Sequence, residues 1–61
     1  MSDKQKMKRL DEISEEIFEM AKEFEIEKKS GVFVFLRESV NNIKNAQKNY
    51  ELNYQEMDKN E

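Results

Sequence analysis

Cysteine, histidine, proline and tryptophan are absent from this sequence of 61 residues, and glycine occurs once. Without cysteine the chain has no disulfide and no thiolate site, and without histidine it lacks the commonest general base and the commonest metal ligand. The serines have no histidine to activate them, and no glycine-rich phosphate loop occurs. We therefore expect a protein that is not an enzyme and that uses no cofactor and no metal ion.

Long apolar runs are missing as well. The longest uncharged apolar run covers residues 31–36, far fewer than the roughly 20 residues that span a bilayer. The basic residues near the N-terminus are followed by Asp11 and Glu12 rather than by an apolar segment, unlike in a signal peptide. We therefore expect a cytoplasmic protein without membrane contact. Its Lys-, Glu- and Asn-rich composition is typical of an AT-rich bacterial or phage genome.

A chain of this size forms one domain, residues 1–61, and such small domains are marginally stable alone. Charged residues make up 41% of the chain and hydrophobic residues 36%, which would indicate disorder if the apolar residues were scattered. They recur instead at regular spacing. Because small domains without disulfides or metals commonly gain stability by oligomerisation, we expect a homodimer.

The apolar residues predict two helices. No proline interrupts helix formation, and Ser2 followed by Gln5 fits a capping box. From there the apolar positions alternate in steps of three and four, a heptad spacing that predicts helices over about 2–30 and about 32–58. The first seam contains Leu10, Ile13, Ile17, Met20 and Phe24, and the second contains Phe33, Leu36, Val40, Ile43, Gln47, Tyr50, Tyr54 and Met57.

The single glycine is the predicted turn. Gly31 suits the left-handed position that ends a helix, so the two helices would fold into an all-α antiparallel hairpin. A fold at this residue places Gln47 opposite Ile17, and Tyr50 opposite Ile13. As the one polar residue of its seam, Gln47 is predicted to fix the register of the helices.

A second architecture stays open for the region around the glycine. Residues 24–27 alternate between apolar and acidic side chains, and residues 32–35 have high β propensity. The four residues between them could form a turn. The alternative fold is therefore a helix, a β-hairpin and a second helix.

Several apolar residues lie outside the two seams. They are Phe18 on the first helix and Val32, Val34 and Phe35 near the turn. Contiguous exposed apolar patches usually mark interfaces. We expect self-association into a four-helix bundle to cover part of this surface, and a protein partner to dock on the remainder.

The first helix also carries an acidic face, formed by Glu12, Glu15, Glu16, Glu19 and Glu23. Metal sites in helical bundles use glutamates that project inward beside histidines, whereas these glutamates lie outside the seam. They predict a solvated face or a docking surface for a basic partner. The sequence therefore favours a small regulator or adaptor that binds a protein through the apolar patch near the turn, the acidic face, or both.

A basic cluster supports a different hypothesis. Near the N-terminus it contains Lys4, Lys6, Lys8 and Arg9, and on the second helix Lys44 and Lys48 lie one turn apart amid asparagines. The predicted hairpin resembles in size and topology the plasmid-encoded Rop type of RNA-binding hairpin dimer. That resemblance implies nucleic-acid binding, whereas the net charge of −3 opposes strong phosphate binding. A structural component of phage type is a third hypothesis.

Overall fold

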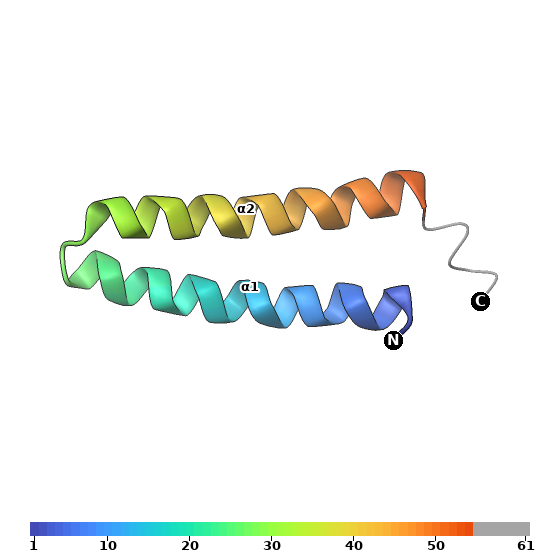
Figure 1. The fold of residues 1–61 in the computed structure, drawn as a ribbon, viewed down its shortest axis with the longest axis horizontal. Coiled ribbons are helices and arrows are strands. Elements are labelled where there is room, and N and C mark those ends of the chain that lie inside the picture. The colour runs from blue at the N-terminus through green and yellow to red at the C-terminus, as the bar shows by residue number, and fades with distance from the viewer. Residues whose placement is uncertain (55–61) are drawn as a thin grey trace.

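The computed structural model describes residues 1–54, which form two α-helices. Helix α1 spans Asp3–Ile26 and helix α2 spans Ser30–Asn53. The helices run antiparallel and side by side, with the turn at one end and the N-terminus at the other (Figure 1). The predicted all-α hairpin is confirmed. The β-hairpin alternative is wrong, because residues 30–36 are helical and no strand occurs in residues 1–54.

Helix α1 begins at the predicted capping box. The Ser2 side chain accepts a hydrogen bond from the Gln5 backbone N–H at 3.2 Å. In return the Ser2 backbone N–H donates to Gln5 Oε1 at 2.9 Å. Two of the backbone donors that a helix leaves unpaired at its start are thereby satisfied.

The turn lies at residues 27–29, not at Gly31 as the sequence predicted. Lys28 is the residue with a positive φ, of 65°. Its N–H donates to the Glu25 carbonyl at 3.0 Å, and the Lys29 N–H donates to the Phe24 carbonyl at 2.9 Å. This pair of hydrogen bonds is the Schellman motif. At the two positions where a hydrophobic contact often accompanies it, a cation–π contact is present instead, with Lys29 Nζ 5.6 Å from the Phe24 ring centroid.

The apolar seam explains why α1 ends before the glycine. The seam position that follows Phe24 falls at Glu27 or Lys28, and both residues are exposed in the turn. A longer α1 would carry these charges into the contact with α2, where desolvation penalises them. Gly31 instead lies within the first turn of α2 and has no positive φ.

The new turn position changes the register of the two helices. Gln47 contacts Met7 and Asp11 rather than Ile17, and Tyr50 reaches Asp3 rather than Ile13. The predicted register is therefore wrong by about two helical turns. Moving the turn three residues toward the N-terminus shortens the first helix and extends the second toward the turn by the same amount. The residue of α1 that faces a given residue of α2 therefore changes by about six positions.

The contact between the helices is thin. In the described residues only Ser14 and Ala21 are fully buried, and no large side chain is. Half-buried side chains line the rest of the contact: Met7, Leu10, Ile13, Ile17, Phe24, Phe33, Leu36, Val40, Ile43, Gln47 and Tyr50. Ser14 and Ala21 are seven residues apart, and their small side chains let the backbones approach closely.

Two seam positions behave differently. Met20 is 47% exposed and Tyr54 is 52% exposed, whereas the heptad spacing placed both on the seam. The α-helix has 3.6 residues per turn rather than 3.5, so Met20 lies off the line of closest contact in a straight pair of helices. Tyr54 is instead the C-cap residue, where α2 ends. Helix α2 ends at Asn53. The remainder of the predicted second helix, including Met57, lies outside the described residues.

Candidate functional site

A polar bridge joins the helices near their open end. Gln47 Nε2 donates to Asp11 Oδ1 at 2.8 Å and to the Met7 carbonyl at 3.0 Å. Lys44 Nζ donates to the same Asp11 oxygen at 3.2 Å. Gln47 is half-buried, and its amide is satisfied from α1 in the observed register. That Gln47 fixes how the helices align stays a prediction.

The polar bridge changes the acidity of Asp11. The hydrogen bond from Gln47, followed by that from Lys44, lowers the pKa of the Asp11 carboxyl below its ordinary value of 3.8. Both donors favour the charged carboxylate. One turn farther along, Tyr50 Oη donates to Asp3 Oδ2 at 3.1 Å and extends the polar contacts toward the end of the hairpin.

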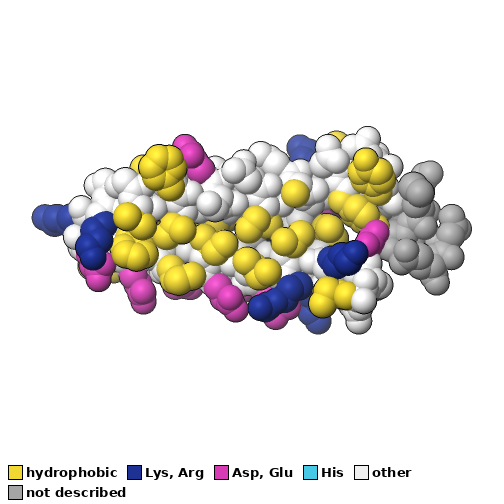
Figure 2. Space-filling model, in the orientation of Figure 1, with side chains coloured by type: hydrophobic (Ala, Val, Ile, Leu, Met, Phe, Trp, Pro, Cys, Tyr) yellow, Lys and Arg dark blue, Asp and Glu magenta, His cyan; other side chains and the backbone are white. Residues whose placement is uncertain are grey.

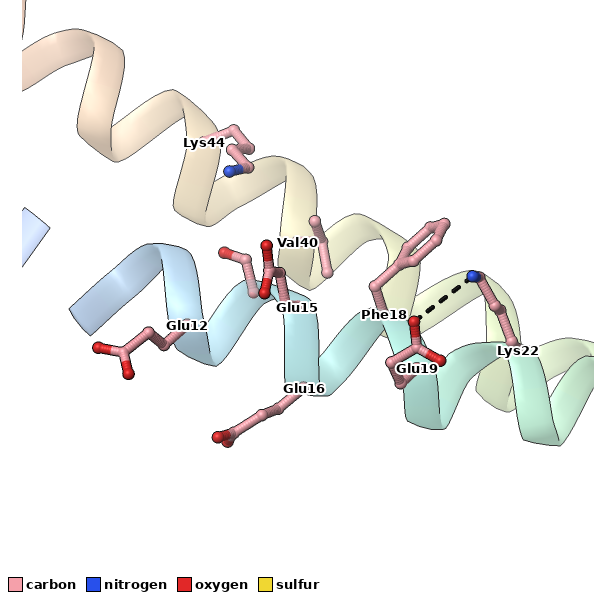
Figure 3. Close-up of a pocket in the computed structure, with 9 residues that line it drawn as sticks. Glu12, Glu15, Glu16, Phe18, Glu19, Lys22, Val40 and Lys44 are labelled. Atoms are coloured by element: carbon pink, nitrogen blue, oxygen red, sulfur yellow. Dashed lines mark hydrogen bonds and ion pairs between the residues drawn. The ribbon is translucent and has the colours of Figure 1, made fainter. Parts of the chain in front are cut away.

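An acidic groove runs beside the bridge, between the middle of α1 and the middle of α2 (Figure 3). Most of its lining comes from α1, and α2 contributes Val40 and Lys44. We use the name acidic groove for the set Glu12, Ser14, Glu15, Glu16, Phe18, Glu19, Lys22, Val40 and Lys44.

The apolar part of the groove is Phe18 together with Val40. Phe18 is 38% exposed, and Lys22 Nζ lies 4.9 Å from the centre of its ring. Lys22 also contacts Glu19 at 3.5 Å, shown by the dashed line in Figure 3. The ring therefore has one cation beside it and a further edge open to solvent.

The carboxylates of the groove are incompletely neutralised. Glu12 lies 3.9 Å from Arg9, and Glu19 pairs with Lys22. Glu15 and Glu16 form no ion pair with any residue in 1–54. The groove therefore presents uncompensated negative charge next to an exposed aromatic ring.

The structure brings together five of the nine predicted partner-binding residues. Glu12, Glu15, Glu16, Phe18 and Glu19 line the acidic groove, whereas Glu23 does not. The three apolar residues near the turn lie on α2 away from it, with exposed fractions of 43% for Val32, 48% for Val34 and 70% for Phe35.

Sequence reasoning did not assign Ser14, Lys22 or Lys44 to this surface. Ser14 follows the seam residue Leu10 by four positions, a spacing that already indicated burial. Its Oγ is buried and has no hydrogen-bond partner in the described residues. The position of Lys44 depends on the register, which the sequence did not give correctly.

The chemistry available in the described residues is limited. Among residues 1–54, no three acidic side chains are close enough to hold a metal ion. Ser39 Oγ donates to the Phe35 carbonyl at 3.0 Å, and Ser2 caps α1. In the same part of the chain neither helix is long and apolar enough to cross a membrane.

Comparisons of the chain with models of protein families, with curated proteins and with solved structures found no match.

Proposed function

We propose that this protein is a non-enzymatic interaction module, a small regulator or adaptor that binds a basic amphipathic segment of a partner protein in the acidic groove. The observation that supports the proposal is the exposed ring of Phe18 beside two carboxylates, Glu15 and Glu16, that lack an ion pair within residues 1–54. An aromatic anchor within a polar rim is a common feature of protein-binding sites.

The two components of the groove have separate roles in binding. The carboxylates attract a positively charged segment and orient it as it approaches, which raises the association rate more than the affinity. Phe18 and Val40 then accept an apolar side chain from the partner, and its burial provides most of the affinity. A helix with basic and apolar residues at i, i+3 and i+4 presents both features on one face.

A defined peptide tests the groove. The probe is a fluorescent 18-residue Lys/Leu amphipathic helix, and its Glu/Leu counterpart with the same apolar face is the negative control. We expect saturable binding of the Lys/Leu peptide in fluorescence anisotropy, weakened by salt. Phe18→Ser should weaken it further, whereas Val34→Ser, at a comparably exposed apolar residue outside the groove, should not.

A charge-matched pair of variants separates the groove from general attraction to an acidic protein. The groove variant replaces Glu12, Glu15 and Glu19 by Gln, and the control replaces Glu25, Glu38 and Glu51 by Gln. Exposed ion pairs contribute about 0.3–0.5 kcal/mol each, so the groove variant should raise Kd about five- to tenfold. Equal losses in both variants, or no binding by the parent protein, would overturn the proposal.

The nucleic-acid hypothesis receives less support from the contacts. Lys44, one of its two central cations, is engaged by Asp11 at 3.2 Å and borders the acidic groove. A phosphate backbone arriving at Lys44 would meet the carboxylates of that groove. We therefore base the proposal on a protein partner.

A further inference from the structure

The face of the hairpin opposite the acidic groove is broad and apolar. The contact between Asp11 and Lys44 marks the groove side. Met20 is nine residues from Asp11, and Phe35 is nine residues from Lys44. Nine residues make two and a half helical turns, so Met20 and Phe35 lie on the opposite side. We call this side the apolar face; by helical spacing it contains Ile13, Met20, Phe24, Val32, Phe35, Ile43 and Ala46.

The apolar face is continuous and largely uncovered. Figure 2 shows hydrophobic side chains in an unbroken band along the junction of α1 and α2. Phe35 is 70% exposed, Met20 is 47% and Val32 is 43%. Since no large side chain in residues 1–54 is fully buried, the hairpin by itself lacks the packed interior that stabilises a globular domain.

The area of the apolar face is close to the area that each partner contributes to a protein interface of standard size. Each helix has 24 residues and is therefore about 36 Å long. The layer is 18 Å wide between Cα atoms and 10 Å thick, so the outline of the face is roughly 650 Å² before side chains are included. A standard interface takes about 800 Å² of accessible surface from each partner. One further two-helix layer of the same size would cover it.

The charges beside the apolar face are divided between its two ends. Lys6 and Arg9 precede Ile13 by seven and four residues, and Glu16 and Glu23 each follow an apolar-face residue of α1 by three. Arg9, Glu16 and Glu23 therefore lie along one edge of the face, and Lys6, in line with Ile13, lies on the face itself near the open end. Figure 2 shows acidic side chains along this edge toward the turn and basic ones toward the open end, with further basic side chains at the turn itself.

The other edge of the apolar face has one charged residue, Glu38, which follows Phe35 by three. It carries Asn42, Asn49 and Asn53 of α2. Lys6 and Arg9 are engaged only within α1, by Asp3 at 3.4 Å and by Glu12 at 3.9 Å. Both basic side chains are more than half exposed, so they can form new pairs at little cost.

We propose that the apolar face binds a second copy of this chain, face to face and with the turns at opposite ends. This arrangement stacks α1 on the α1 of the partner subunit in antiparallel orientation, so Lys6 and Arg9 approach Glu16 and Glu23 of the partner subunit. Two such charge clusters form, related by the two-fold axis. The product is a four-helix bundle whose interior is the apolar face of both copies.

Charge selects this orientation over the alternative with both turns at one end. In that parallel dimer α1 would stack on the α2 of the partner subunit, so Lys6 and Arg9 would face the asparagines at the open end rather than carboxylates. The apolar burial is similar in both arrangements, so the charge clusters decide between them. The acidic groove remains open on the outer side of each copy, and Glu16 is the one residue that belongs both to the groove and to the charged edge of the dimer.

Spin labelling tests the dimer and its orientation together. The chain has no cysteine, so Ser30→Cys beside the turn gives a single labelling site. In the proposed dimer the two labels are separated by about a helix length, roughly 36 Å or more. The parallel dimer would bring them within roughly 10–20 Å, about one or two interhelix spacings. A short distance would overturn the orientation, and absence of dipolar modulation would overturn the dimer.

Charge reversal provides a second test that does not depend on a label. One variant carries Lys6→Glu and Arg9→Glu, and the other carries Glu16→Lys and Glu23→Lys. Each should self-associate at least about tenfold more weakly than the parent, because like charges meet in both clusters. Mixing the two should restore a dimer in sedimentation equilibrium, since every cluster then pairs opposite charges.

The control pair reverses charges away from the edge, with Lys4→Glu and Lys8→Glu in one variant and Glu12→Lys and Glu19→Lys in the other. These variants carry the same net charge changes, but their helical positions point away from the apolar face. They should dimerise like the parent. Equal behaviour of both pairs would show that net charge rather than the proposed contact controls association, and would overturn the antiparallel arrangement.

Discussion

The most direct test of the fold moves the single glycine from position 31 to position 28. Lys28 adopts φ 65°, a conformation that costs a residue with a Cβ atom about 1–2 kcal/mol. Glycine avoids this cost but loses about 0.5–1 kcal/mol more backbone entropy on folding. Lys28→Gly should therefore increase the free energy of unfolding by about 0.5–1 kcal/mol.

Gly31 presents the converse case. It lies in the first turn of α2 with helical backbone, and a Cβ atom added there would meet nothing within 4 Å. Gly31→Ala should therefore stabilise the protein by about 0.4–1 kcal/mol, mainly by restricting the unfolded chain. The double variant should gain about 1–2 kcal/mol, and Tm should rise by about 4–8 °C for each kcal/mol.

Thermal unfolding followed by circular dichroism, at one protein concentration for all variants, measures these effects. Lys28→Ala is the matched control, because it removes the charge yet keeps the Cβ atom, and it should leave Tm nearly unchanged. Lys29→Gly should lower Tm, since it removes the contact with Phe24. A loss of stability in both Lys28→Gly and Gly31→Ala would place the turn at Gly31 and refute the observed hairpin.

Three further predictions follow from single side chains. Ser14→Ala should leave the free energy of unfolding in urea unchanged or raise it by up to about 0.5 kcal/mol, because the buried Oγ has no partner in the described residues and alanine is the better helix former. A loss above about 1 kcal/mol would contradict this account. Ala21→Leu should destabilise by about 1–3 kcal/mol, since Ala21 is 0% exposed where the helices meet, and the same assay measures it. The lowered pKa of Asp11 gives stability that is present above its ordinary pKa and lost as pH falls through 3.8 and below. Asp11→Asn should therefore flatten the acid limb of the stability curve, and an unchanged acid limb would rule out this role for the polar bridge.

The candidate site illustrates which features a sequence can show. Phe18 and the glutamates of the acidic groove were recognisable, because residues three and four positions apart share one face of a helix. Lys44 was not recognisable as their neighbour, because it lies on the other helix. Its position depends on the turn, and a turn assigned to Gly31 placed the wrong residues of α2 opposite α1.

The sequence by itself determined the two helices, the capping box at Ser2 and the half-buried residues from Leu10 to Tyr50. These features depend on local hydrogen bonding and on the periodicity of apolar side chains. The tertiary structure decided the turn, the register and the exposure of Met20. Lys28 is the left-handed residue because a turn at this position keeps charged side chains out of the contact with α2. The Schellman hydrogen bonds also form at this position. Neither condition is visible until the two helices are packed together.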